Sequence, residues 1–179
     1  MNKISPENLF EYKCYDLALK ENNKDPYKDS AFKIFKQMSS KKKGKYFELI
    51  VEEYLRKNNY RVQKAVSTDH DRIVKCNDNT IKALEIKGSF LWGDGTHFRW
   101  QQIRTNQDYD VICFLAVFPD RIELYGSEKN VVKDNLEIQN DKGEWMYNQH
   151  GGKSVNSGTF FMDGMPEDFK WFKPLVEVL

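Results

Sequence analysis

Two acids and a lysine in the first half of the chain have the types and the spacing of a metal-dependent hydrolytic site. Glu85 and Lys87 are two residues apart within residues 80–88, which read as one strand, so their side chains point to the same face. Asp71 begins the strand-like segment before it. Carboxylates hold a hard divalent cation, and a lysine beside them can orient or deprotonate a water molecule. Together these side chains have the chemistry that phosphodiester hydrolysis requires.

The acid-x-Lys pattern alone is not specific, because it also occurs at residues 11–13 and 168–170. The first copy falls in a predicted helix and the second follows a proline, so only the copy with Glu85 is on a predicted strand. Its partner acid is Asp71 or Asp69, and the sequence does not separate the two. A two-residue hairpin turn would direct either acid away from Glu85. We therefore predict a three-residue turn or a bulge, which brings the acid and Glu85 to one face.

The hydrophobic pattern predicts a mixture of helices and strands. Apolar side chains repeat at helical spacing over residues 47–55, and residues 110–118 are almost wholly apolar, which is typical of a strand buried on both faces. The predicted elements are helices over 29–38 and around 47–55, strands 60–66, 71–76 and 80–89, a helix over 98–106, and strands 110–118, 121–125 and 159–162. This order favours an α/β (α+β) fold, with a central mixed β-sheet of about five strands flanked by helices.

Length, charge and cysteine content limit the class of protein. The 179 residues fit one domain. The net charge is only +1, but residues 28–64 carry 11 Lys or Arg against 4 Asp or Glu, which suits contact with phosphates. The three cysteines show no zinc-ligand spacing, and we find no signal segment and no apolar run of membrane-spanning length. We therefore expect a soluble protein of a reducing, cytoplasmic compartment, without a membrane partner.

Three segments follow one another in an order that is typical of one nuclease superfamily. They are Gly44-Lys45-Tyr46-Phe47-Glu48-Leu49-Ile50-Val51, His70-Asp71-Arg72-Ile73-Val74 and Glu85-Ile86-Lys87. Over residues 44–126 the chain resembles the PD-(D/E)xK nucleases, which include many type II restriction endonucleases. His70 stands where members of that superfamily often have proline.

The resemblance implies a Mg²⁺ site, in which Mn²⁺ can substitute. The implied metal ligands are Asp71, Glu85, the main-chain carbonyl of Ile86, and Glu48 from the first helix. The implied catalytic residues are Lys87, which activates the water, together with Asp71, Glu85 and Glu48. In some branches of the superfamily the next helix points a glutamine at the site, and Gln101 and Gln102 both qualify.

The activity that the resemblance implies is Mg²⁺-dependent, sequence-specific cleavage of double-stranded DNA by a type II restriction endonuclease of bacterial or phage origin. A palindromic target would imply a homodimer. We expect one nuclease domain over residues 1–179, with a helical part at 1–43, a catalytic core at 44–126 and a C-terminal extension at 127–179. The candidate DNA contacts are Lys43, Lys45, Gln101, Gln102, Arg104, His150, Lys153 and Asn156.

Two other functions stay open on the sequence. The same site would serve a nuclease that recognises DNA structure, such as a junction resolvase or repair nuclease, although the C-terminal extension favours sequence readout. In a non-catalytic DNA-binding module, Asp71, Glu85 and Glu48 would be ordinary solvated acids. Carboxylates of Asp71 and Glu85 that converge within shared reach of one ion favour a nuclease, whereas widely separated carboxylates favour the binding module.

Overall fold

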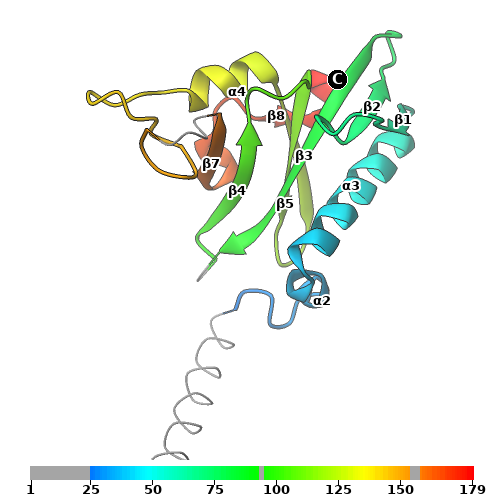
Figure 1. The fold of residues 1–179 in the computed structure, drawn as a ribbon. Helices are drawn as coiled ribbons and strands as arrows, with labels where there is room; N and C mark the ends of the chain where they lie inside the picture. Colours follow the sequence, from blue (N-terminus) through cyan, green and yellow to red (C-terminus); the bar gives the residue numbers. More distant parts are fainter. Residues whose placement is uncertain (1–24, 93–94, 154–157) are drawn as a thin grey trace, which may run out of the picture.

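The chain folds around a large mixed β-sheet flanked by a few helices, in an α+β arrangement (Figure 1). The computed structural model describes residues 25–92, 95–153 and 158–179. The helices predicted in the first 24 residues, and the acid-x-Lys copy at 11–13, lie outside these ranges. The elements are α2 (Lys33–Gln37), α3 (Ser40–Lys57), β1 (Arg61–Lys64), β2 (Arg72–Lys75), β3 (Ile81–Trp92), β4 (His97–Arg104), β5 (Val111–Val117), β6 (Ile122–Glu128), α4 (Lys129–Leu136), β7 (Thr159–Gly164), the 3₁₀-helix η1 (Pro166–Asp168), β8 (Lys173–Pro174) and α5 (Leu175–Val178). Within the described ranges, no helix has the length and apolar character that crossing a bilayer requires.

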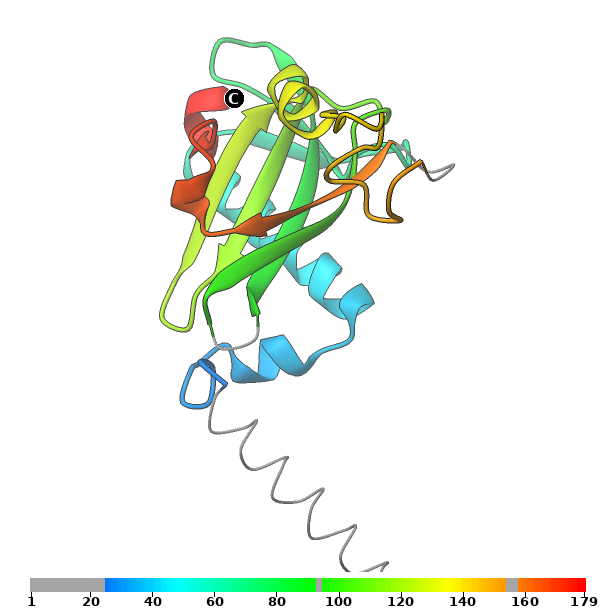
Figure 2. The ribbon, with the colours of Figure 1, turned by 90° about the vertical axis from the view of Figure 1, so that its left-hand side faces the viewer.

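The strands follow the order β1-β2-β3-β5-β6-β8, and β4 pairs with both β3 and β7. β3 and β5 are parallel, whereas the other pairs are antiparallel. Figure 2 shows α3 behind the sheet and β7 crossing in front of it. Since both faces are covered, every residue of β5 is buried, as its apolar sequence predicts.

The hairpin between β2 and β3 has the predicted three-residue turn. The Cys76 N–H donates to the Thr80 carbonyl across the turn, and Asn79 adopts a φ of 69°, which asparagine tolerates better than most residues. The pairing register is the one that a three-residue turn requires, and it brings Asp71 and Glu85 to one face. The prediction of an odd turn is therefore confirmed.

The helix predicted over residues 98–106 is wrong, because this segment is strand β4. Phe98, Trp100 and Ile103 are its buried side chains. A β-bulge between Trp100 and Ile103 inserts one residue into β4. The buried positions are therefore separated first by two residues and then by three, and this spacing resembles the apolar stripe of a helix. The partner that fixes the strand is β7, which is distant in sequence and leaves no local signal. Over the residues that the structure describes, the sheet has eight strands rather than about five.

Helix α3 packs on β3 through its apolar stripe, of which Phe47, Val51 and Leu55 are buried. The closest approach is at Gly88, where an added Cβ would be 2.3 Å from Phe47 Cδ2. The position therefore requires glycine for contact between helix and strand.

We expect Gly88→Ala to lower the free energy of unfolding by about 1–3 kcal/mol, because the Phe47 ring must move out of its packed position. Urea unfolding followed by circular dichroism measures the change. Gly44→Ala is the matched control, since Gly44 is in α3 and has no atom within 4 Å of an added Cβ. It should be neutral or stabilising by up to about 1 kcal/mol. Equal stability of the Gly88→Ala and wild-type proteins would contradict the close contact.

Candidate active site

Asp71 is located where β2 separates from β3 and leaves the edge of β3 open. Its N–H donates to the Leu84 carbonyl over 3.0 Å, and its Oδ2 accepts the Ile86 N–H over 2.8 Å. This single residue replaces a strand partner along a short part of β3. Because the N–H and C=O of one strand residue point to the same edge, the Ile86 carbonyl faces this open edge as well.

Glu85 is a buried carboxylate, with only 6% of its surface exposed. Its Oε1 lies 2.6 Å from Lys87 Nζ. Burial raises the pKa of Glu85, the Lys87 ammonium partly offsets this effect, and the negative charge of Asp71 adds to the rise. The net pKa is above the ordinary value of a glutamate, with burial as the main cause and the charge of Asp71 as a smaller one.

The oxygen atoms at this edge suit a hard divalent cation. Ile86 donates to Asp71 Oδ2, and Lys87 contacts Glu85 Oε1. The second oxygen of each carboxylate, Asp71 Oδ1 and Glu85 Oε2, accepts no hydrogen bond from the described residues. Mg²⁺ commonly uses one or two carboxylates and completes its shell with water and substrate phosphate oxygens. The donor set therefore fits Mg²⁺ or Mn²⁺. In the part of the chain that the structure describes, no group of three or more His, Cys, Asp or Glu side chains is arranged for a metal.

Glu48 contacts Arg72 rather than Asp71 and Glu85. Its Oε2 is 2.9 Å from Arg72 Nη1, and Glu52 Oε2 is 2.8 Å from Arg72 Nε. The same Nη1 donates to the Asp71 carbonyl over 2.8 Å. Glu48 thus reaches the site through the buried Arg72 guanidinium, and its direct role as a metal ligand stays a prediction.

We expect Glu48→Gln to leave Mg²⁺ affinity unchanged and to lower the free energy of unfolding by about 1–3 kcal/mol, because buried Arg72 loses a charged partner. Titration calorimetry and urea unfolding measure the two quantities. Glu53→Gln, exposed on the same helix, is the control. A loss of Mg²⁺ affinity of about tenfold or more would instead make Glu48 a ligand.

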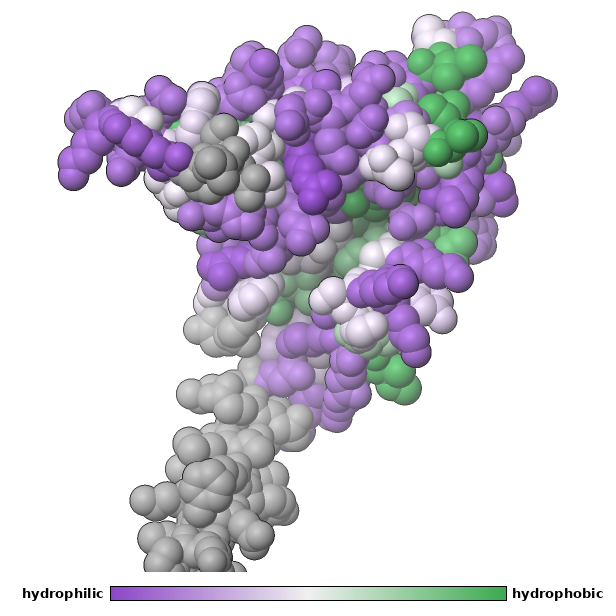
Figure 3. Space-filling model, in the orientation of Figure 1, coloured by the Kyte–Doolittle hydropathy of each residue, from purple (hydrophilic) through white to green (hydrophobic). Residues whose placement is uncertain are grey.

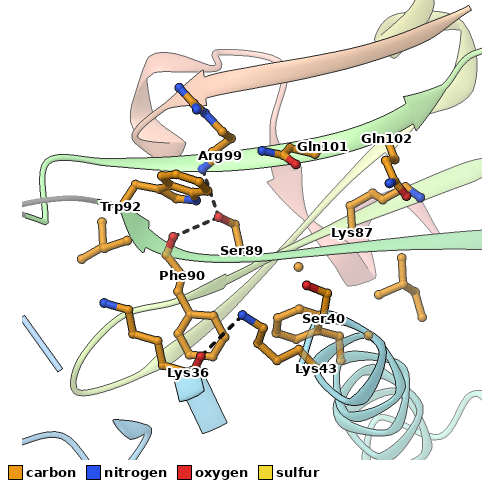
Figure 4. Close-up of a pocket in the computed structure, with 15 residues that line it drawn as sticks. Lys36, Ser40, Lys43, Lys87, Ser89, Phe90, Trp92, Arg99, Gln101 and Gln102 are labelled. Atoms are coloured by element: carbon orange, nitrogen blue, oxygen red, sulfur yellow. Dashed lines mark hydrogen bonds between the residues drawn. The ribbon is translucent and has the colours of Figure 1, made fainter. Parts of the chain in front are cut away.

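A groove of about 570 Å³ runs along the open edge of β3 (Figure 4). The region of α2 and α3 forms one wall, β3 the floor and β4 the other wall. Its lining contains Lys36, Lys43, Lys87 and Arg99, and no acidic residue among those that the structure describes. The space-filling view is hollowed between α3 and β4, with hydrophilic side chains around the hollow (Figure 3). Lys36, Lys87 and Arg99 are ion-paired with Asp25, Glu85 and Asp163, which partly neutralises their charges. The lining is therefore moderately basic, and it suits a negatively charged ligand that can share these cations.

The structure brings some of the candidate DNA contacts to this groove and separates others. Lys43, Gln101 and Gln102 line it. Arg104 is on the same strand as the glutamines, and its charge acts on Glu85. Lys45 instead lines a second hollow on α3, where lysines are mixed with acids.

The candidates of the C-terminal extension lie before β7. His150 and Lys153 are exposed, and Asn156 is outside the described residues. Gln149 joins this segment to β4, because its Oε1 accepts the Gln102 N–H over 2.7 Å.

Of the two acids that the sequence left open, Asp71 is the one that contacts β3. The carboxylate of Asp69 accepts a hydrogen bond from the Ser67 hydroxyl in the preceding turn. His70, between the two acids, is directed elsewhere, since its Nδ1 lies 2.9 Å from the Asp108 carbonyl.

Sequence reasoning missed several residues of the groove. Ser89 had a usable signal, because it continues the alternation of Glu85 and Lys87 along one strand face. Arg99 had none, since its guanidinium is fixed by Asp163 at 2.6 Å, a pair that exists only because β4 and β7 are neighbours.

Comparison with known proteins gives distant similarity at the level of structure. No family model matches the chain, and no curated protein matches it. Among solved structures, the chain is similar to a bacterial homing endonuclease, I-Ssp6803I, with 17% sequence identity and a TM-score of 0.43. The match covers 52% of this chain and 67% of that one. At this level of likeness, function has to be argued from the geometry of the site.

Proposed function

We propose that the chain is a Mg²⁺-dependent, sequence-specific endodeoxyribonuclease of the type II restriction kind. The observation that supports this proposal is the open edge of β3, where Asp71, Glu85 and Lys87 come together beside a groove whose described lining includes Lys36, Lys43, Lys87 and Arg99. A buried carboxylate with a raised pKa is typical of functional sites. A phosphodiester polyanion is the substrate that suits both the cationic groove and the carboxylate pair.

The residues divide the chemistry among them. Asp71, Glu85 and the Ile86 carbonyl would hold the ion, which when bound neutralises phosphate charge and lowers the pKa of a coordinated water. Lys87 would orient the attacking water by donating a hydrogen bond from its ammonium, and the proton of the water would leave to solvent, to which this side chain is partly open. Lys43 and Arg99 would bind phosphates along the groove. The hydrogen bonds of Asp71 to Leu84 and Ile86 keep its carboxylate aimed at the edge.

The C-terminal extension favours sequence readout over recognition of DNA structure. It supplies β7, which pairs with β4 along the groove wall, and Gln149, which binds the β4 main chain. Neither contact is needed for cleavage at Asp71 and Glu85. A non-catalytic DNA-binding module gives no reason for the buried charge of Glu85.

Incubation of the protein with plasmid DNA and Mg²⁺ tests the proposal. We expect discrete fragments that disappear with EDTA and return with Mn²⁺. A smear would indicate a non-specific nuclease, and cleavage only of branched or flapped DNA would indicate a structure-specific one. Intact DNA with every substrate and metal would contradict nuclease function. Because one site cuts one strand, cleavage of both strands at a palindrome predicts a homodimer. Light scattering, which measures the molar mass in solution, tests for it.

A further inference from the structure

Strand β4 has an irregular segment on the wall of the groove. Its pairing with β7 shifts between Trp100 and Ile103, which is a β-bulge, and Gln102 has a φ of 56°. Glutamine is uncommon in this left-handed region and pays an energetic penalty there. Among the described residues, the other non-glycine positions with positive φ are Asn59 and Asn79, and both are at turns. The backbone at Gln102 is therefore unusual for a strand.

The bulge exposes two neighbouring amide side chains together. A regular strand alternates its faces, yet Gln101 and Gln102 are both exposed and both line the groove. Neither amide side chain has a hydrogen-bond partner among the residues that the structure describes. Figure 4 shows them on the β4 wall, across the groove from Ser40 and Lys43 on the helical wall. Two free amides thus border the groove of the candidate active site.

The C-terminal extension holds the bulge in place. Gln149 Oε1 accepts the Gln102 N–H over 2.7 Å, and the Gln149 N–H donates to the Thr159 carbonyl over 3.0 Å. β7 pairs with β4 on both sides of the bulge. The amides are consequently carried by a two-stranded part of the sheet, in which β4 beyond its short pairing with β3 is bonded to β7.

Building on the proposed function, we propose that the Gln101–Gln102 bulge reads a base pair of duplex DNA beside the cleaved phosphate, with Gln149 as its positioning residue. A two-stranded β-ribbon fits the major groove, and a glutamine amide pairs with adenine N6 and N7. The preferred substrate therefore carries an A·T pair next to the cut. The lysines and Arg99 contact phosphates, which fixes register without reading sequence.

The test uses the full-length protein and a library of randomised duplexes in two arms. In one arm, Mg²⁺ is present and the cleaved ends are sequenced. In the other, Ca²⁺ replaces Mg²⁺ and bound duplexes are sequenced, so that no cleavage is needed. We expect a strong preference for A·T at one position near the cut. Gln101→Ala and Gln102→Gly should each reduce preference at that position by about 10- to 100-fold. Gln63→Ala on β1 is the control.

The outcomes separate this inference from the proposed function. Cleavage by variants whose sequence profile equals that of the wild type would overturn base reading and leave the nuclease intact. Cleavage without any A·T preference in the wild type would do the same. Selective binding that depends on Gln101 or Gln102, without cleavage under any metal, would support base reading and reject the nuclease. Absence of both binding and cleavage would reject both.

The role of Gln149 has its own readout. Gln149→Ala removes the acceptor for the Gln102 N–H and should alter the base profile at the same position as the bulge variants. Gln149→Glu retains an acceptor oxygen and should restore the profile, even where added negative charge weakens overall binding. A profile that is unchanged in Gln149→Ala would overturn the positioning role.

Discussion

Replacing Lys87 by methionine is expected to slow DNA cleavage by at least about 100-fold while DNA binding survives. Lys87 Nζ is 2.6 Å from Glu85, so its ammonium is fixed beside the carboxylates proposed to hold the metal. Methionine keeps most of the apolar stem and removes the ammonium that would orient the attacking water. Groups of this kind typically contribute about 10²- to 10⁴-fold to a rate. Single-turnover cleavage of supercoiled plasmid measures the rate, and filter binding in Ca²⁺ measures the affinity.

The chain supplies a matched control for this experiment. Lys170 ends the other described acid-x-Lys copy, at residues 168–170, where the acid accepts the Met165 N–H in a surface turn. Lys170→Met should leave the cleavage rate unchanged. Because Lys87 opposes the rise in the pKa of Glu85, Lys87→Met should raise that pKa further, so cleavage by both variants should be compared across a range of pH. A Lys87→Met enzyme within tenfold of the wild type would refute the assigned role.

The parts of the site that the sequence predicted depend on local geometry. Turn length and two-residue alternation are properties of adjacent residues, so a three-residue turn at once gives the hairpin register and the shared face of Asp71 and Glu85. The choice of that turn over a two-residue one came from the requirement that the two acids meet. The buried strand β5 is equally local, because a run of apolar residues records burial on both faces.

The parts that the sequence did not predict depend on partners far along the chain. β4 reads as a helix until β7 is placed beside it. The contact of Glu48 with Arg72, which lies twenty-four residues later, is likewise absent from the local sequence pattern, and the role of Glu48 as a metal ligand stays a prediction. Glu48 and Glu52 are one helical turn apart, so a single basic side chain can contact both. This spacing is the feature of the sequence that could have predicted their shared contact with Arg72.

Glu85→Gln is expected to abolish cleavage and, at neutral pH, to make the protein more stable than the wild type. The carboxylate is buried, and its pKa in the folded state is above the value of about 4.5 expected in the unfolded chain. The folded state therefore binds a proton more tightly than the unfolded state. The stabilisation that protonated Glu85 contributes is complete below about pH 4.5 and is lost as pH rises through the folded-state pKa of Glu85. Glutamine has no such loss, so the difference in Tm between the variant and the wild type should widen as pH rises above about 4.5.

The same variant separates the metal site from the fold. Mg²⁺ at 100 times its Kd should stabilise the wild type by about 2.7 kcal/mol, because the ion binds only the folded state. Glu85→Gln removes a ligand and should lose most of this gain while remaining folded. Glu53→Gln, at an exposed position of α3, should keep both the Mg²⁺ effect and the wild-type pH dependence. Wild-type and Glu85→Gln proteins with parallel pH–stability curves would show that Glu85 is not buried as a charge. An undiminished Mg²⁺ effect in Glu85→Gln would place the ion elsewhere.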